Sequence, residues 1–133
     1  MASMKSLRSQ RVVVLLSLLG GTLLLGIGIR YLAAPEAAAL TFGIPKRPQG
    51  LELHYITGFR NIWLGGMAVA LATLREWRAL ALWFAMGSIV CFADAYIAAS
   101  SAGRWPHVSF HVACGVASVG LSWAAFREFR KGG

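Results

Sequence analysis

Three side chains capable of acid–base chemistry lie inside apolar stretches of this sequence. Arg60, with Asn61 beside it, interrupts the apolar stretch 51–74; Asp94 is the one carboxylate well inside such a stretch; and His111 lies in the last one. An arginine in hydrocarbon costs at least about 2.5–3.5 kcal/mol, so it normally faces a protein interior or a wet cavity and has a partner. We therefore expect Arg60 to lie beside Asp94.

Helix geometry places these three side chains at one depth. With a rise of about 1.5 Å per residue, Arg60 and Asp94 each lie roughly 12 Å from the outer ends of their helices, and His111 lies roughly 9 Å from its own. A carboxylate held beside an arginine stays ionised and can act as a base or direct a water molecule. A histidine, directly or through Asn61, can protonate a leaving oxygen. We expect the catalytic residues to be Asp94, Arg60, His111 and Asn61.

The chemistry that this set supports needs no cofactor. Epoxide hydrolysis, epoxide-opening cyclisation and double-bond isomerisation of a lipophilic small molecule all proceed by proton transfer, and exclusion of bulk water strengthens the charges that drive it. The sequence leaves open whether Asp94 attacks directly or through water. Five flanking side chains are expected to contact the substrate: His54, His107, Tyr55, Trp63 and Tyr96.

Each assignment has a structural alternative. Arg60 and Asp94 could form an ion pair that only sets helix packing, and His54 and His107 could be solvated residues at the membrane surface. His107 and His111, four residues apart, could chelate a metal with Asp94 or His54 as third ligand, but no H-E-x-x-H pattern exists. We expect no metal site.

Composition indicates a single all-α domain, residues 1–133, in a membrane. The chain is 57% hydrophobic and 14% charged, against about 25% charged residues in average soluble proteins. Four apolar stretches predict a four-transmembrane-helix bundle with spans at about 12–33, 51–74, 79–102 and 105–126. The first is too long for the apolar region of a signal peptide, so we expect it to be retained.

The outer loop 34–50 is the longest connection. Its segment Pro35–Phe42 is mildly apolar and predicts a short helix in the interface, and 42–45 reads as a turn. With four spans, eight of the thirteen basic residues fall on the side of both termini and four on the other, with Arg60 inside the membrane. Both termini are therefore predicted to be cytoplasmic. We expect this membrane to be the endoplasmic reticulum in a eukaryote or the inner membrane in a bacterium.

Four short motifs carry a family resemblance. F-G-I-P at 42–45, G-F-R-N at 58–61, F-A-D at 92–94 and a histidine on the last span occur in this order. Over about residues 12–125 the chain resembles small four-helix membrane proteins known only as a domain of unknown function, near the DoxX-like group.

A second resemblance rests on size, span number and the Arg/Asp/His set. In these the chain is similar to the small membrane hydrolases and cyclases of fungal polyketide pathways of the aurovertin type, which open epoxides. That resemblance implies that Asp94 is the base or positions the nucleophile, Arg60 is its partner and His111 is the acid.

Three classes of function remain open. The first is the acid–base enzyme in the bilayer, with small faces that leave room for a homo-oligomer. The second is a non-catalytic scaffold or accessory subunit, and the third is a proton-coupled carrier, for which four short spans offer little room. The formal charge of +8 lies at the ends of the spans, where lipid head groups attract it, so we expect no nucleic acid partner.

Overall fold

The computed structural model describes residues 4–44, 50–101 and 104–132, and in this part the protein is entirely α-helical. Five helices follow one another along the chain: α1 (Met4–Ala33), α2 (Pro35–Phe42), α3 (Glu52–Leu74), α4 (Trp77–Ser101) and α5 (Trp105–Gly132). The short helix predicted over Pro35–Phe42 is confirmed, with proline in its first turn.

At the ends of the chain, two helices continue beyond the predicted spans. The first helix begins at Met4, so most of the basic leader is helical, and the last one continues through the basic tail to Gly132. Lysine and arginine are good helix formers. Arg130 and Lys131 also lie in the last turn of α5, where positive charge complements the helix dipole. Charge therefore marked the end of the apolar stretch and not the end of the helix.

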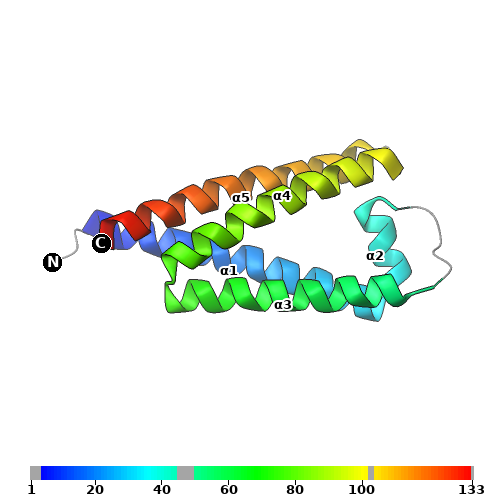
Figure 1. Cartoon of the computed structure of the whole chain (residues 1–133), viewed down its shortest axis with the longest axis horizontal. Coiled ribbons are helices and arrows are strands. Elements are labelled where there is room, and N and C mark those ends of the chain that lie inside the picture. The colour runs from blue at the N-terminus through cyan, green and yellow to red at the C-terminus, as the bar shows by residue number, and fades with distance from the viewer. Residues whose placement is uncertain (1–3, 45–49, 102–103, 133) are drawn as a thin grey trace.

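The four long helices form two antiparallel pairs. Figure 1 shows α1 beside α3 and α4 beside α5, with the pairs meeting at the end that carries both termini and diverging toward the other end. The short helix α2 crosses between the pairs at the diverging end. The molecule is therefore a wedge that is closed at one end and spanned by α2 at the other.

Glycine lets α1 and α3 approach closely. A Cβ added at Gly21 would lie 3.0 Å from the Gly65 carbonyl oxygen, and one at Gly28 would lie 2.7 Å from the Gly58 carbonyl oxygen. Glycines seven residues apart on both helices thus face each other. Small residues at such a contact let the backbones pack directly, which makes this pair a rigid unit.

The α4–α5 pair is joined by side chains. Ser122 donates a hydrogen bond of 2.8 Å from Oγ to the Ala81 carbonyl oxygen, and the Phe92 ring fills the space that a Cβ at Gly115 would take. A hydroxyl bonded across two helices is stabilising where water is scarce.

The closed end of the wedge contains the apolar core. Its buried side chains come from all four long helices: Val13, Ala72, Leu80, Ala81, Phe84 and Ala125. Beside it, Glu128 is 2% exposed and accepts hydrogen bonds from Ser9 Oγ at 2.6 Å and from Lys131 Nζ. The Ser9 bond ties α1 to α5 and so joins the two pairs, whereas the Lys131 bond lies within α5.

The turn between α3 and α4 connects the pairs at the closed end. Arg75 adopts the left-handed conformation with φ of 57°, and the Glu76 N–H returns to the Leu71 carbonyl oxygen at 3.0 Å. The left-handed region costs a residue with a side chain about 1–2 kcal/mol. This conformation lets the chain reverse its direction sharply, so that α4 begins at Trp77.

Three helices, α1, α4 and α5, are long and apolar enough to cross a membrane. The fourth long helix, α3, is not among them, because Arg60 and Asn61 interrupt its apolar run. Its 23 residues nevertheless span about 34 Å at the helical rise, against a hydrocarbon thickness of about 30 Å.

We predict that Gly28→Ala destabilises the protein by about 1–3 kcal/mol, because the new methyl group meets backbone atoms that cannot move aside. Gly26→Ala is the matched control on the same helix, since nothing lies within 4 Å of its added Cβ. Thermal melts in detergent should show a lower melting temperature for Gly28→Ala alone. Equal melting of the two variants would contradict the close α1–α3 contact.

Candidate functional site

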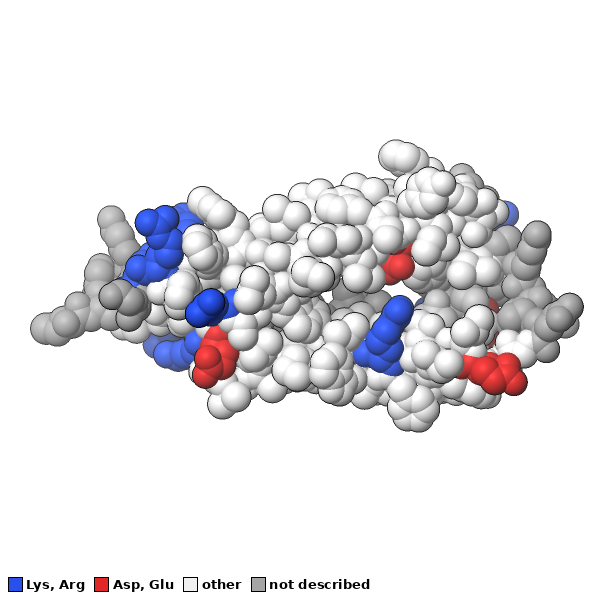
Figure 2. Space-filling view, viewed as in Figure 1, with Lys and Arg blue, Asp and Glu red and all other residues white. Residues whose placement is uncertain are grey.

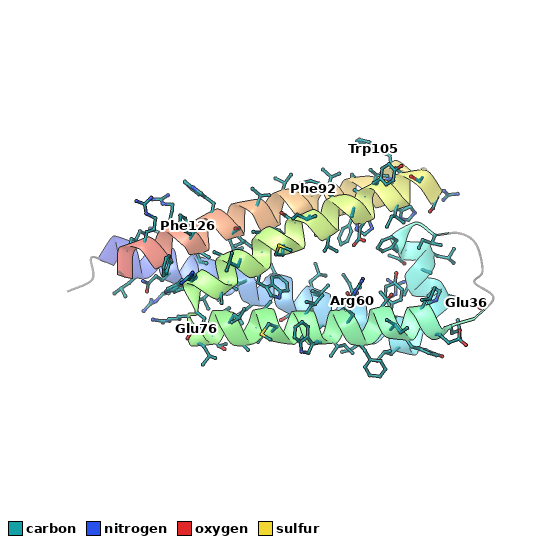
Figure 3. The ribbon with its side chains drawn as sticks, viewed as in Figure 1. Glu36, Arg60, Glu76, Phe92, Trp105 and Phe126 are labelled. Atoms are coloured by element: carbon teal, nitrogen blue, oxygen red, sulfur yellow. The ribbon has the colours of Figure 1, made fainter. Side chains whose placement is uncertain are left out.

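A hollow separates the two helix pairs between α3 and α4. Figure 2 shows this hollow with one basic side chain on the rim formed by α3 and one acidic side chain on the rim formed by α4. The only basic residue of α3 is Arg60 and the only acidic residue of α4 is Asp94. Figure 3 shows the Arg60 side chain extending from α3 toward α4. We call this feature the inter-pair hollow.

Arg60 and Asp94 face each other without touching. Among the described residues, no ion pair within 4.0 Å joins them, and neither side chain makes a hydrogen bond. Arg60 is exposed and Asp94 is half-buried. The Asp94 carboxylate nevertheless lies in electrostatic range of His111 and, more weakly, of Arg60. The three predicted residues are therefore brought together as charges across a gap.

His111 has one ring nitrogen engaged in structure. Its Nε2 lies 3.3 Å from the Phe42 carbonyl oxygen at the end of α2, and its ring centroid lies 4.4 Å from that of Phe42. A carbonyl oxygen can only accept, so Nε2 carries the proton and donates. The side chain is 8% exposed. Only Nδ1 remains for chemistry with Asp94.

His107 makes the companion contact one turn earlier. Its Nδ1 donates to the Thr41 carbonyl oxygen at 2.9 Å. The preceding carbonyls of α2 are bonded within the chain, because the Gly43 N–H reaches the Leu40 oxygen and the Ile44 N–H reaches that of Ala39.

With the two histidines, all of the last four α2 carbonyls, which have no partner within the helix, have donors. We call the group of Thr41, Phe42, His107 and His111 the α2 anchor. The Gly43 backbone passes tightly between α2 and the α4–α5 pair, with φ of 108° and an added Cβ 3.1 Å from that of His107.

The α2 anchor uses the two histidines that the sequence offered as metal ligands, His107 and His111. One nitrogen of each histidine is bonded to an α2 carbonyl, which leaves Nε2 of His107 and Nδ1 of His111 as the nitrogens that a metal could use. In the described ranges, no three of the His, Cys, Asp and Glu side chains gather as metal ligands would.

Tyr31 is a residue that the sequence reasoning missed. It lies near the end of α1 and is 6% exposed, and its phenol oxygen is in electrostatic range of both Asp94 and Arg60. All four long helices therefore contribute a polar group to this region. A tyrosine at a span end usually reads as an interfacial anchor. The signal that could have found it is its position opposite His54 in an antiparallel α1–α3 pair.

His54 and Asn61 lie on α3, on either side of this region. The His54 ring centroid is 6.0 Å from that of Tyr31, and the buried His54 Nδ1 has no hydrogen-bond partner among the described residues. Asn61 is half-buried, and no hydrogen bond of its side chain is found in the part of the chain that the structure describes. Both therefore retain polar atoms that could serve a bound molecule.

Three expected substrate contacts lie on the outer surface. Tyr55 is 41% exposed, Trp63 62% and Tyr96 75%. Side chains this exposed make little contact with the rest of the protein. Their role in binding stays a prediction, and in a bilayer their rings also suit contact with lipid.

The sequence of residues 21–125 matches the family described as a domain of unknown function, DUF4267. The chain belongs to the DUF4267 family. The matched range begins within α1 and ends within α5, so Tyr31, Arg60, Asp94 and His111 all lie inside it. No curated protein and no solved structure matches this DUF4267 chain.

We predict that removing the histidine donors loosens α2. His107→Ala and His111→Ala each remove a hydrogen bond of about 1 kcal/mol, so local opening of α2 should rise about fivefold for each. Hydrogen–deuterium exchange of the α2 amides measures this opening. Ser109→Ala is the control, because its hydroxyl bonds only the Pro106 carbonyl oxygen of its own helix. Unchanged α2 exchange in both histidine variants would contradict the anchor.

Proposed function

We propose that this protein is a four-span integral membrane protein with both termini in the cytoplasm. The three apolar helices support the proposal, and so does the length of α3 beside its glycine-packed partner α1. Both termini lie at one end of the wedge, and Figure 2 shows basic side chains gathered at that same end. Excess Lys and Arg mark the cytoplasmic side.

We further propose that it is a cofactor-independent acid–base enzyme acting on a lipophilic small molecule. The observation that carries this proposal is the separation of Arg60 and Asp94 across the inter-pair hollow without an ion pair. Charged groups at this depth are costly unless paired or hydrated. A residue pair that served only to fix packing would be in contact, whereas an open pair leaves room for water and substrate.

Epoxide hydrolysis illustrates how the groups would act. Asp94 takes a proton from water, the water oxygen bonds to an epoxide carbon, and the carbon–oxygen bond of the ring breaks. The resulting alkoxide receives a proton from Nδ1 of a doubly protonated His111, while Nε2–H stays bonded to Phe42. Asp94 then returns its proton to His111, its strongest electrostatic neighbour. Epoxide-opening cyclisation uses the same transfers with a substrate hydroxyl in place of water.

The remaining polar groups support this chemistry. Arg60 contributes positive charge on the opposite rim, and Asn61 and His54 keep polar atoms available to orient a substrate. The rival function, a scaffold pinned by an Arg60–Asp94 ion pair, would need the contact that these two described residues lack.

We predict that Asp94→Asn lowers turnover about 10²–10⁴-fold without loss of fold, because the amide cannot take up the proton. The assay follows conversion of a lipophilic epoxide, cis-stilbene oxide, to its diol by purified protein in detergent. Glu76→Gln is the matched control, since Glu76 is an exposed carboxylate in the turn at the closed end.

Two results would count against the enzyme. Turnover by Asp94→Asn equal to that of the parent would exclude a catalytic carboxylate. Loss of folded protein in both Arg60→Gln and Asp94→Asn, with recovery in the double variant, would show a structural pair instead.

A further inference from the structure

Arg60 places a positive charge inside a helix of membrane length, and no acidic side chain of the described residues is in contact with it. Among the described residues it forms no ion pair and no hydrogen bond, and its side chain extends into the space between the pairs (Figure 3). Its guanidinium presents five N–H donors in a planar fork that matches a carboxylate. Asp94, the acidic residue on the opposite rim, stays across the hollow. The donors are therefore available to a ligand.

Tyr31 supplies a second donor in the same region. Its ring is held by burial against the α1–α3 pair, next to His54, while its hydroxyl interacts electrostatically with Arg60 and Asp94. A phenol held in place donates a hydrogen bond without losing side-chain freedom on binding. A guanidinium and a phenol together form a site for an oxyanion.

We propose that the inter-pair hollow binds the carboxylate of a lipophilic acid, with the guanidinium of Arg60 and the hydroxyl of Tyr31 as its donors. The proposal rests on the proposed function and names its substrate class as apolar molecules that carry an acid group. Asp94 remains free for proton transfer, because its strongest electrostatic neighbour is His111 on its own side of the hollow.

Depth and surroundings favour a carboxylate on an apolar tail. Arg60 lies eight positions beyond Glu52, the first residue of α3, which is roughly 12 Å along the helix. A membrane lipid keeps its phosphate in the head-group layer, outside this depth. Apart from the basic and the acidic side chain on its two rims, the surface beside the hollow in Figure 2 carries neither Lys and Arg nor Asp and Glu. That surface suits a hydrocarbon chain.

The test compares ligands that differ only in the head group. Binding of palmitate, hexadecanol and hexadecyl phosphate is measured by isothermal titration calorimetry on the full chain in lipid nanodiscs. We expect palmitate to bind about tenfold or more tightly than hexadecanol, as a charge-assisted contact implies. Hexadecyl phosphate should bind more weakly than palmitate. This comparison uses the unmodified chain and needs no variant.

Variants locate the carboxylate. Arg60→Gln should lose the preference for palmitate over hexadecanol, and Tyr31→Phe should reduce it several-fold. The control is Arg104→Gln, which changes an exposed arginine just before α5 and should keep the preference. Arg60→Lys keeps the charge and should retain part of the preference. Equal binding of palmitate and hexadecanol, or an unchanged preference in Arg60→Gln, would overturn the proposal. Tighter binding of hexadecyl phosphate would show a phosphate site instead.

These experiments distinguish a failure of the carboxylate-binding proposal from a failure of the enzyme proposal. Asp94→Asn should bind palmitate at least as tightly as the parent, because it removes a negative charge near the ligand, although we expect it to lose turnover. If palmitate binding shows no head-group preference while the parent still converts cis-stilbene oxide, the substrate class is wrong and the enzyme stands.

Discussion

The open end of this molecule depends on two hydrogen bonds from α5 to the last carbonyls of α2. The last four carbonyls of a helix have no partner within the helix, and His107 and His111 supply donors to two of them. Because α2 is joined to α1 by a single residue and anchored on α5, it spans the distance between the two helix pairs. The pairs are thereby connected at both ends and kept apart between them.

The separation of the two pairs keeps Arg60 and Asp94 from forming an ion pair. The glycine contacts make α1 and α3 one rigid unit, so Tyr31 and Arg60 move together on one side. Asp94 and His111 lie on the other unit, α4–α5. If the pairs closed along their length, Arg60 and Asp94 would neutralise each other as a buried ion pair. Held apart, they are available to water and a ligand. Keeping the two charges unpaired costs free energy, which the packing of the apolar core at the closed end offsets.

The sequence predicted what depends on local pattern and height along a helix. The short helix after Pro35 followed from local composition, and the shared level of Arg60, Asp94 and His111 followed from the helical rise. The distance between Arg60 and Asp94 across the helix pairs could not be predicted, because the position of a residue along its helix does not fix how far apart two helices lie. The role of His111 was missed in part, since which α2 carbonyls need donors is decided only when α2 meets α5.

The most direct test asks whether water reaches Arg60 in the membrane. In a background with Cys91→Ala and Cys114→Ala, Arg60→Cys is treated with a charged methanethiosulfonate reagent in vesicles, beside Ile89→Cys, an apolar position on the outer face of α4 that is 63% exposed. A hydrated hollow predicts rapid labelling of Arg60→Cys and slow labelling of Ile89→Cys. Equally slow labelling at both positions would show that the two pairs close together in the bilayer.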